Sequence, residues 1–315
     1  MSALPTRLAP LAPLALVGAV WGSTMPMTKT AVTVGYTPIG LIFWQLAIGA
    51  VVLSALTLLR GRRLSLERRH FAIYAMIALV GTILPNSVSY EAAGHLPAGI
   101  MAIVVSLVPM MAFPVAIAFG QDRFSALRFL GLLLGLVAIT LIALPEASLP
   151  ERAMVAWLPV ALVAPLFYAF EGNLVAKFGT GGLDPVQTLA GASILGTCLV
   201  LPVTWATGTF IDPRVVWGAA EWSILGIGLA HAAAYSGYVW LVGWAGAVFA
   251  AQVSYLVTAF GIFWSWLLLS ETYSLWVWAS VAVMFTGLTL VQPRQPQALQ
   301  HPRGPVQDGA SGTHQ

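Results

Sequence analysis

Ten apolar stretches, each about 20 residues long, follow one another along this chain of 315 residues. A helix of about 20 mostly apolar residues is long enough to cross a lipid bilayer. Charged residues make up 8% of the chain, against about 25% in soluble domains. We therefore predict an all-α integral membrane protein with ten transmembrane helices, at about 11–31, 40–59, 71–91, 98–118, 125–144, 155–176, 187–207, 223–243, 247–268 and 275–292. Such a composition excludes a soluble enzyme and a disordered protein.

The basic residues indicate how the chain is oriented in the membrane. If the N-terminus is cytoplasmic, eleven of the fourteen Lys and Arg residues lie in inner segments: Arg7, Arg60, Arg62, Arg63, Arg68, Arg69, Arg123, Arg128, Lys177, Arg294 and Arg303. Short basic loops resist translocation, so both termini are predicted to be cytoplasmic in a cell inner membrane. The net charge of +3 then reflects membrane orientation, and the lipid bilayer rather than nucleic acid is the expected partner.

The chain divides into three predicted parts. Residues 1–147 and 148–292 each hold five helices, and residues 293–315 have no apolar periodicity and are predicted to be a disordered cytoplasmic tail. The first stretch could also be a signal peptide, but its length favours a retained helix. Cys198, the one cysteine, cannot form an internal disulfide, and no metal or cofactor site is expected because His and Cys do not recur at ligand spacing.

The second half of the chain weakly repeats the first. An offset of 149 residues aligns Gly94 with Gly243, Leu107 with Leu256, Asp122 with Glu271, Phe124 with Tyr273 and Ser125 with Ser274, while an offset of 148 aligns Lys29 with Lys177. A unit of five helices is odd, so the second unit must enter the membrane from the opposite face. We therefore predict two inverted five-helix repeats, an arrangement that transporters use to face either side of the membrane in turn. Chance similarity between two apolar sequences is the alternative.

Several short motifs carry a family resemblance. They are Trp21-Gly22-Ser23 with Lys29 eight positions after the Trp, Ser106-Leu107-Val108-Pro109, Asp122-Arg123-Phe124-Ser125 and Glu271-Thr272-Tyr273-Ser274. Together with the number of helices, they resemble the EamA family of the drug/metabolite transporter superfamily, in both units, from about residue 11 to 292. The resemblance implies a central cavity lined mainly by helices one, three, four, six, eight and nine. Two positions depart from the family: Asp122 replaces a usual Glu, and Gln45 stands where an Arg is frequent.

Helix six carries an acidic candidate for ion coupling. Tyr168 and Glu171 are three residues apart and share one helix face. A carboxylate inside a membrane segment is a candidate for proton exchange between the two sides. The alternative is a carboxylate near the inner headgroups that is solvated or paired with Lys177.

His231 lies near the middle of helix eight, with Tyr235 one turn further on. An imidazole at that depth could bind substrate or relay a proton. It could equally be a neutral histidine that a neighbouring hydroxyl satisfies, and the sequence does not separate the two.

Other intramembrane polar residues are predicted to bind substrate, because unpaired polar groups are costly in hydrocarbon and generally face other helices or a cavity. They are Trp21, Asn86, Tyr90, Ser106, Gln252, Tyr255 and Thr258, in addition to Tyr168, Glu171, His231 and Tyr235. Packing between helices is the alternative for the hydroxyl groups. Lys29 and Lys177 are expected to anchor opposite membrane faces. Either could instead close a gate by pairing with a carboxylate in one transport state.

These observations favour a secondary transporter that exports small organic metabolites, such as amino acids or drugs, by alternating access with proton coupling. It is not expected to be an enzyme, because no nucleophile motif or His-Glu-x-x-His pair is present. A passive channel and an intramembrane lipid-modifying enzyme are the alternatives. A homodimer is a further possibility.

Overall fold

A computed structural model describes residues 11–245, 250 and 252–291 of the protein. Across these residues the structured elements are helices. Within this described part of the chain, eight spans are long and apolar enough to cross a membrane, and two shorter apolar helices follow them. The prediction of an all-α membrane protein with ten helices is therefore confirmed, whereas the predicted tail, 293–315, lies outside the described residues.

Three spans of the first unit are interrupted near their middle. The unit consists of α1 (Leu11–Gly22), α2 (Thr24–Thr33), α3 (Pro38–Leu59), α4 (Arg68–Ala78), the π-helical segment η1 (Leu79–Ile83), α5 (Leu84–His95), α6 (Ala98–Val105), α7 (Val108–Ala118) and α8 (Ala126–Ala143). Proline cannot donate a hydrogen bond to the carbonyl four residues before it. Pro26 and Pro109 thus release the carbonyls of Gly22 and Val105, where α1 and α6 end, and Pro85 releases the carbonyl of Gly81 within η1.

The second unit consists of longer helices. They are the 3-10 segment η2 (Arg152–Trp157), α9 (Leu158–Phe178), α10 (Pro185–Ala206), α11 (Ala219–Ala245), α13 (Val253–Leu269) and α14 (Leu275–Leu290). The start of α10 is fixed by a capping box, in which the Asp184 carboxylate accepts from the amides of Val186 and Gln187. The ninth helix is predicted at 247–268. Residues 247–249 and 251 of this range lie outside the described residues, and α13 is the helix that the structure describes there.

The two ends of the bundle differ in charge. One end, called the basic end here, holds the turn 60–67 and Lys177; the other, called the acidic end, holds the turns 34–37, 207–218 and 270–274. The chain crosses between them with each span, so α1 begins at the basic end and η2–α9 begins at the acidic end. Five spans per unit invert the second unit relative to the first, as predicted.

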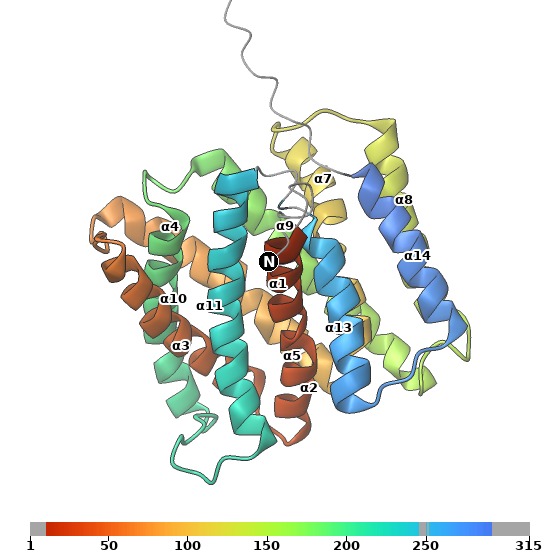
Figure 1. The fold of residues 1–315 in the computed structure, drawn as a ribbon, viewed down its shortest axis with the longest axis horizontal. Helices are drawn as coiled ribbons and strands as arrows, with labels where there is room; N and C mark the ends of the chain where they lie inside the picture. The colour runs from red at the N-terminus through yellow and green to blue at the C-terminus, as the bar shows by residue number, and fades with distance from the viewer. Residues whose placement is uncertain (1–10, 246–249, 251, 292–315) are drawn as a thin grey trace, which may run out of the picture.

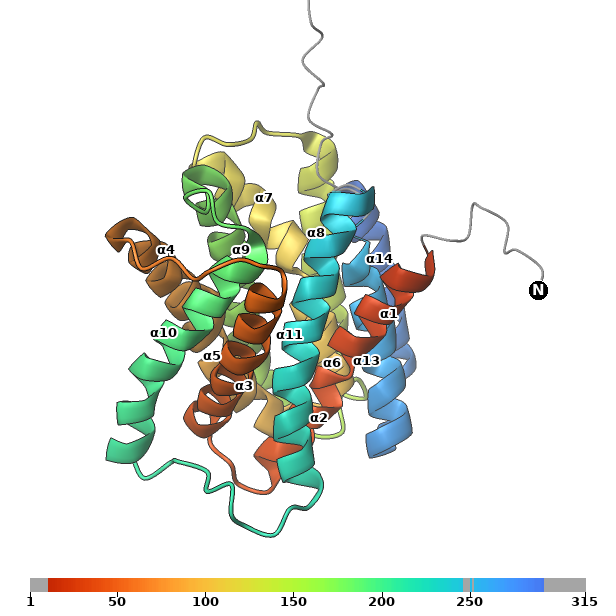
Figure 2. The same cartoon turned by 60° about the vertical axis from the view of Figure 1, so that its left-hand side comes forward.

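Equivalent helices of the two units pack against each other. The second span, α3, contacts the seventh, α10, on one flank, and the fifth, α8, contacts the tenth, α14, on the opposite flank (Figure 1). Between α8 and α14 the backbones approach closely, because a Cβ added at Gly287 would lie 2.8 Å from the Gly131 carbonyl oxygen. Most of the remaining spans lie between these flanks, whereas α4 packs against α10 and reaches the outer edge of the bundle in the turned view (Figure 2). The spans between the two flanks form the centre of the bundle.

Candidate functional site

A cavity of about 400 Å³ lies between the two units. Its walls come from every span except α8 and α14, so helices two and seven contribute as well as the six expected. Its polar and aromatic lining residues are Trp21, Thr24, Thr28, Gln45, Thr82, Asn86, Ser89, Tyr90, Ser106, Tyr168, Glu171, Ser193, His231, Tyr235, Tyr238 and Ser254. The volume falls in the range of small-molecule sites, about 300–1,000 Å³.

Eight of the eleven residues predicted to bind substrate line this cavity: Trp21, Asn86, Tyr90, Ser106, Tyr168, Glu171, His231 and Tyr235. The other three do not. Tyr255 packs edge-on against Phe285, and the fully buried Thr258 donates a hydrogen bond to the Ser254 carbonyl at 3.1 Å. Gln252 lies just before α13. Binding of substrate by any of the eleven stays a prediction.

Gln45 organises one wall of the cavity and is not among the eleven residues predicted to bind substrate. Its Oε1 accepts hydrogen bonds from Asn86 Nδ2, at 3.0 Å, and from the Tyr90 hydroxyl. The Tyr168 hydroxyl donates to Asn86 Oδ1 at 2.6 Å and so joins α9 of the second unit to the first. A buried, satisfied network of this kind holds its members in fixed positions. The signal in the sequence was an amide in the middle of an apolar helix.

Glu171 faces the π-helical segment. A Cβ added at Gly81 would lie 2.7 Å from the Glu171 carboxyl carbon, so the missing side chain of this glycine makes room for the carboxylate. Gly81 and Thr82 belong to η1 and also line the cavity. Within the described residues, no hydrogen bond or ion pair occupies the Glu171 carboxylate. It therefore faces the cavity with its charge unmatched by the protein.

His231 projects from α11 into the same space. Its Nδ1 lies 3.0 Å from the carbonyl oxygen of Ile227, one turn earlier on the helix. A neutral imidazole in this arrangement donates from Nδ1 and keeps Nε2 as an acceptor. The backbone, not a neighbouring hydroxyl, satisfies this nitrogen.

Two charged side chains fix the turn between α5 and α6 at the acidic end. Lys29 Nζ donates to the carbonyls of Ala93, at 2.9 Å, and Gly94, at 3.0 Å, where α5 ends. Glu271 accepts from the amides of Ala98, at 2.7 Å, and Gly99, at 3.1 Å, where α6 begins. Each charge lies at the helix terminus of opposite polarity, which is the stabilising arrangement. Thr28 and Ala93 line the cavity, so these contacts lie at its border toward the acidic end.

Tyr273 adds a contact to this turn from the segment before α14. Its hydroxyl donates to Glu271 Oε2 at 2.8 Å. Burial and this hydrogen bond to an acidic group both raise the pKa of Tyr273 above its ordinary value. The ring also occupies the space that a side chain at Gly99 would need. The hydroxyl proton therefore stays in place and holds the carboxylate toward α6.

The repeat equivalents at the basic end make different contacts. Lys177, which aligns with Lys29, lies over the rings of Phe119 and Phe178. Asp122, which aligns with Glu271, pairs with Arg128. Lys177 forms no ion pair with Glu171 in this structure, so of the two alternatives for this carboxylate the pairing with Lys177 is not seen here, while the solvated carboxylate stays open. The two ends of the bundle are thus held by non-equivalent contacts, as expected for one state of an inverted-repeat protein.

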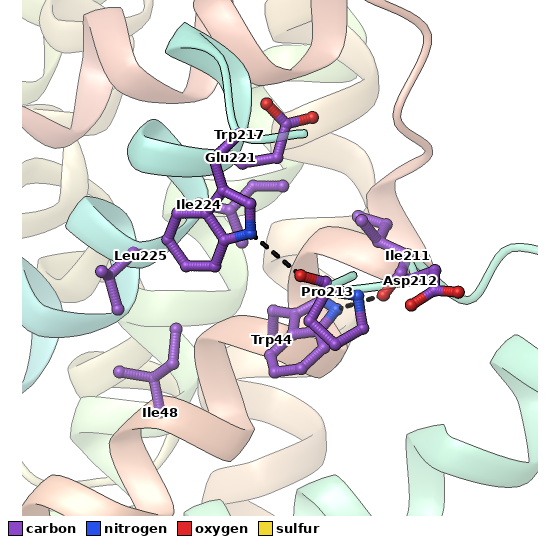
Figure 3. Close-up of a pocket in the computed structure, with 9 residues that line it drawn as sticks. All are labelled: Trp44, Ile48, Ile211, Asp212, Pro213, Trp217, Glu221, Ile224 and Leu225. Atoms are coloured by element: carbon purple, nitrogen blue, oxygen red, sulfur yellow. Dashed lines mark hydrogen bonds between the residues drawn. The ribbon is translucent and has the colours of Figure 1, made fainter. Parts of the chain in front are cut away.

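A second, smaller pocket of about 90 Å³ lies at the acidic end. Two indole groups stand over it: Trp44 Nε1 donates to the Ile211 carbonyl at 3.0 Å, and Trp217 Nε1 donates to the Pro213 carbonyl at 2.9 Å (Figure 3). Its volume is below the range of metabolite sites. The indoles order the turn before α11.

Two polar pairs outside the spans accompany this pocket. Arg214 donates hydrogen bonds to the neighbouring Asp212 carboxylate and lowers the pKa of Asp212 to about 2. Tyr36 donates to Glu221, and this hydrogen bond raises the pKa of Tyr36 above its ordinary value. The Asp212–Arg214 pair lies within the connection between α10 and α11. The bond between Tyr36 and Glu221 joins the first turn of α11 to the turn 34–37 of the first unit.

The sequence matches the EamA-like transporter family in two segments, residues 11–144 and 155–292. These segments correspond to the two five-span units and cover most of the chain. The chain belongs to the EamA-like transporter family. This family is part of the drug/metabolite transporter superfamily, as the motifs predicted, and its members are transporters rather than enzymes.

The comparison with solved structures bears on the fold of this EamA-like protein and not on its function. A solved structure described only as "Crystal structure of protein" superposes with a TM-score of 0.58 at 15% identity, covering 88% of this chain and 94% of the solved chain. At that identity the likeness concerns the fold alone. No curated protein matches the chain in sequence. No group of three His, Cys, Asp or Glu residues able to hold a metal ion occurs in the part of the chain that the structure describes.

Proposed function

We propose that this EamA-like protein is a secondary transporter that exports small organic metabolites across the cell inner membrane by alternating access. The observation that carries the proposal is the cavity between the two units, which both units line with polar and aromatic groups. The contacts of Lys29 and Glu271 close it at the acidic end. An inverted repeat can exchange these contacts for equivalent ones at the other end. The basic end is then the cytoplasmic end, with both termini on that side.

Proton exchange at Glu171 or His231 drives the transport. The Glu171 carboxylate has no ion-pair partner within the described residues and borders a cavity with a mostly apolar wall. An ionised group in such surroundings needs a proton or a positively charged ligand. Each transport state would exchange that proton with a different side of the membrane.

The test is counterflow in proteoliposomes. Purified protein is reconstituted with unlabelled candidate metabolites inside, and uptake of the labelled compound is followed from outside. A carrier takes up the labelled compound faster when the unlabelled compound is present inside the vesicles, whereas a passive channel gives no such acceleration. Absence of counterflow for every compound class would overturn the proposal.

Coupling is tested in the same vesicles with a pH gradient. Glu171→Gln and His231→Ala are compared with Asp212→Asn, a change at the exposed acidic end. The pH dependence of uptake should be lost in at least one of the cavity variants and kept in Asp212→Asn. Unchanged pH dependence in both cavity variants would remove proton coupling but leave carrier function in place.

A further inference from the structure

The formal charge on the described cavity wall is negative only. Among its lining residues within the described part of the chain, Glu171 is the one Asp, Glu, Lys or Arg. His231 adds a ring nitrogen that acts as an acceptor when the imidazole is neutral, because Nδ1 is engaged with the Ile227 carbonyl. A ligand in the cavity therefore meets acceptors and a negative charge, with no Lys or Arg to balance them.

Gln45 contributes a neutral side chain to the cavity wall. It is buried, and its Oε1 already accepts from Asn86 and Tyr90. A carboxylate or phosphate group on a ligand would find only neutral amide and hydroxyl donors there. It would also be repelled by Glu171 in surroundings where charge interactions are weakly screened. The carboxylate of an amino acid meets the same obstacle.

Aromatic rings line the same cavity as the acidic group. Tyr168 shares a helix face with Glu171, and Tyr235, Tyr238 and Trp21 line the same cavity. The Trp21 and Tyr238 rings meet edge to face with centroids 6.3 Å apart, so they form one continuous wall. The faces of aromatic rings attract cations, and the attraction grows when the cation is removed from water. Carboxylate and rings together are the groups that recognise an organic ammonium ion.

We infer that the cavity selects small organic cations, namely protonated amines with an apolar or aromatic body. Glu171 is the countercharge for the bound amine. Gln45 is neutral and therefore places no positive charge of the protein beside that amine. The inference rests on the proposed transport function and adds the class of substrate. It separates amines from amino acids and from anionic metabolites, all of which fit the cavity by size.

The first experiment measures binding to purified protein with three matched probes. The probes are 2-phenylethylamine, 2-phenylethanol and 3-phenylpropionate, which share an aromatic body and differ in charge. Quenching of tryptophan fluorescence reports binding. The amine should bind at least about ten-fold more tightly than the alcohol, since it forms one additional charge-assisted contact with Glu171. The carboxylate should bind more weakly than the alcohol.

Charge variants then locate the selectivity. In Glu171→Gln the preference of the amine over the alcohol should fall to within about two-fold, while binding of the alcohol is kept. Gln45→Arg should weaken the amine and improve the carboxylate, which a merely structural role would not produce. Asp212→Asn changes a carboxylate outside the cavity and should leave all three affinities unchanged. Thermal unfolding and gel filtration establish that each variant is folded.

The outcomes separate this inference from the proposed function. Binding of the alcohol or the carboxylate as tightly as the amine, or amine selectivity that survives in folded Glu171→Gln, overturns the cation inference. Counterflow of neutral or anionic compounds with no binding of amines overturns it as well and leaves the carrier function standing. Selective amine binding without counterflow of any compound supports the cation site and overturns the transport function.

Discussion

Lys29 and Glu271 bind the two sides of a single turn. Lys29 reaches the last carbonyls of α5, and Glu271 reaches the first amides of α6, so residues from opposite ends of the chain hold the same short connection. Neither side chain bonds the other. Each instead neutralises the exposed backbone groups of a helix terminus. In the proposed transport cycle, this relationship closes the cavity at the acidic end without an ion pair between the two residues.

Removal of either charge should open the acidic end. We expect Lys29→Met and Glu271→Gln to raise the population open to that end by about ten-fold each, since a hydrogen bond to a charged group contributes roughly 1.5–3 kcal/mol. The measurement uses Ser89→Cys, which places a thiol in the cavity wall, in a Cys198→Ala background. The rate of labelling by an impermeant maleimide is followed from the acidic side.

Lys177→Met is the matched control for that labelling experiment. It removes the equivalent lysine at the basic end, whose contacts are aromatic rings rather than helix carbonyls. Its labelling rate from the acidic side should remain at the level of the parent. Equal increases in Lys177→Met and Lys29→Met would show that the closure does not depend on the α5–α6 turn.

Gly81→Ala should disturb the position of Glu171. The added methyl group would lie 2.7 Å from the carboxyl carbon and 2.8 Å from Oε1, a separation that forces the carboxylate to move. We expect the affinity for a transported compound to fall several-fold, seen as a raised KM in the counterflow assay. Gly172→Ala is the control, because nothing lies within 4 Å of its added Cβ. Equal KM values in the two variants would contradict the prediction.

Asp184 should matter more as a helix cap than as an ion-pair partner. It accepts from the first amides of α10 and also pairs with Arg60 and Arg62, both half exposed. Loss of a cap costs about 1 kcal/mol, whereas exposed ion pairs contribute roughly 0–1 kcal/mol. Asp184→Ala should therefore lower the unfolding temperature in detergent clearly more than Asp184→Asn, which keeps a capping oxygen. Equal losses would assign the effect to the arginines.

The hydrogen bond between Tyr36 and Glu221 should stabilise the folded state by an amount that decreases at alkaline pH. The pKa of Tyr36 is raised in the folded protein by its hydrogen bond to Glu221. A raised pKa means that the folded state holds the proton more tightly, so the contribution is complete below about pH 10 and is lost at higher pH. Tyr36→Phe should unfold at a lower temperature than the parent at pH 8.

The difference in unfolding temperature should shrink as the pH rises through the folded pKa of Tyr36. Ser223→Ala, which removes a hydroxyl bonded within its own helix, is a control whose effect should not depend on pH. A Tyr36→Phe difference that stays constant to high pH would contradict the assignment.

The sequence determined the class of the fold, the number of spans and the inversion of the two units. These follow from the lengths of apolar segments and from an odd number of crossings, and neither depends on how side chains meet. Pro26 and Pro109 coincide with two of the helix interruptions, because the missing amide proton acts locally. Pro114, Pro165 and Pro202 lie inside continuous helices, so proline alone does not determine where a span is interrupted.

Tertiary structure decided which polar residues share one space. Helical spacing placed Tyr168 beside Glu171, but it could not show that Asn86 links Tyr168 to Gln45 across three helices. Nor could it show that Thr258 and Tyr255 pack away from the cavity while Tyr238 lines it. The rotation of each helix about its axis depends on close contacts such as that of Gly131 with Gly287. Those contacts form between residues far apart in the chain, where local periodicity carries no information.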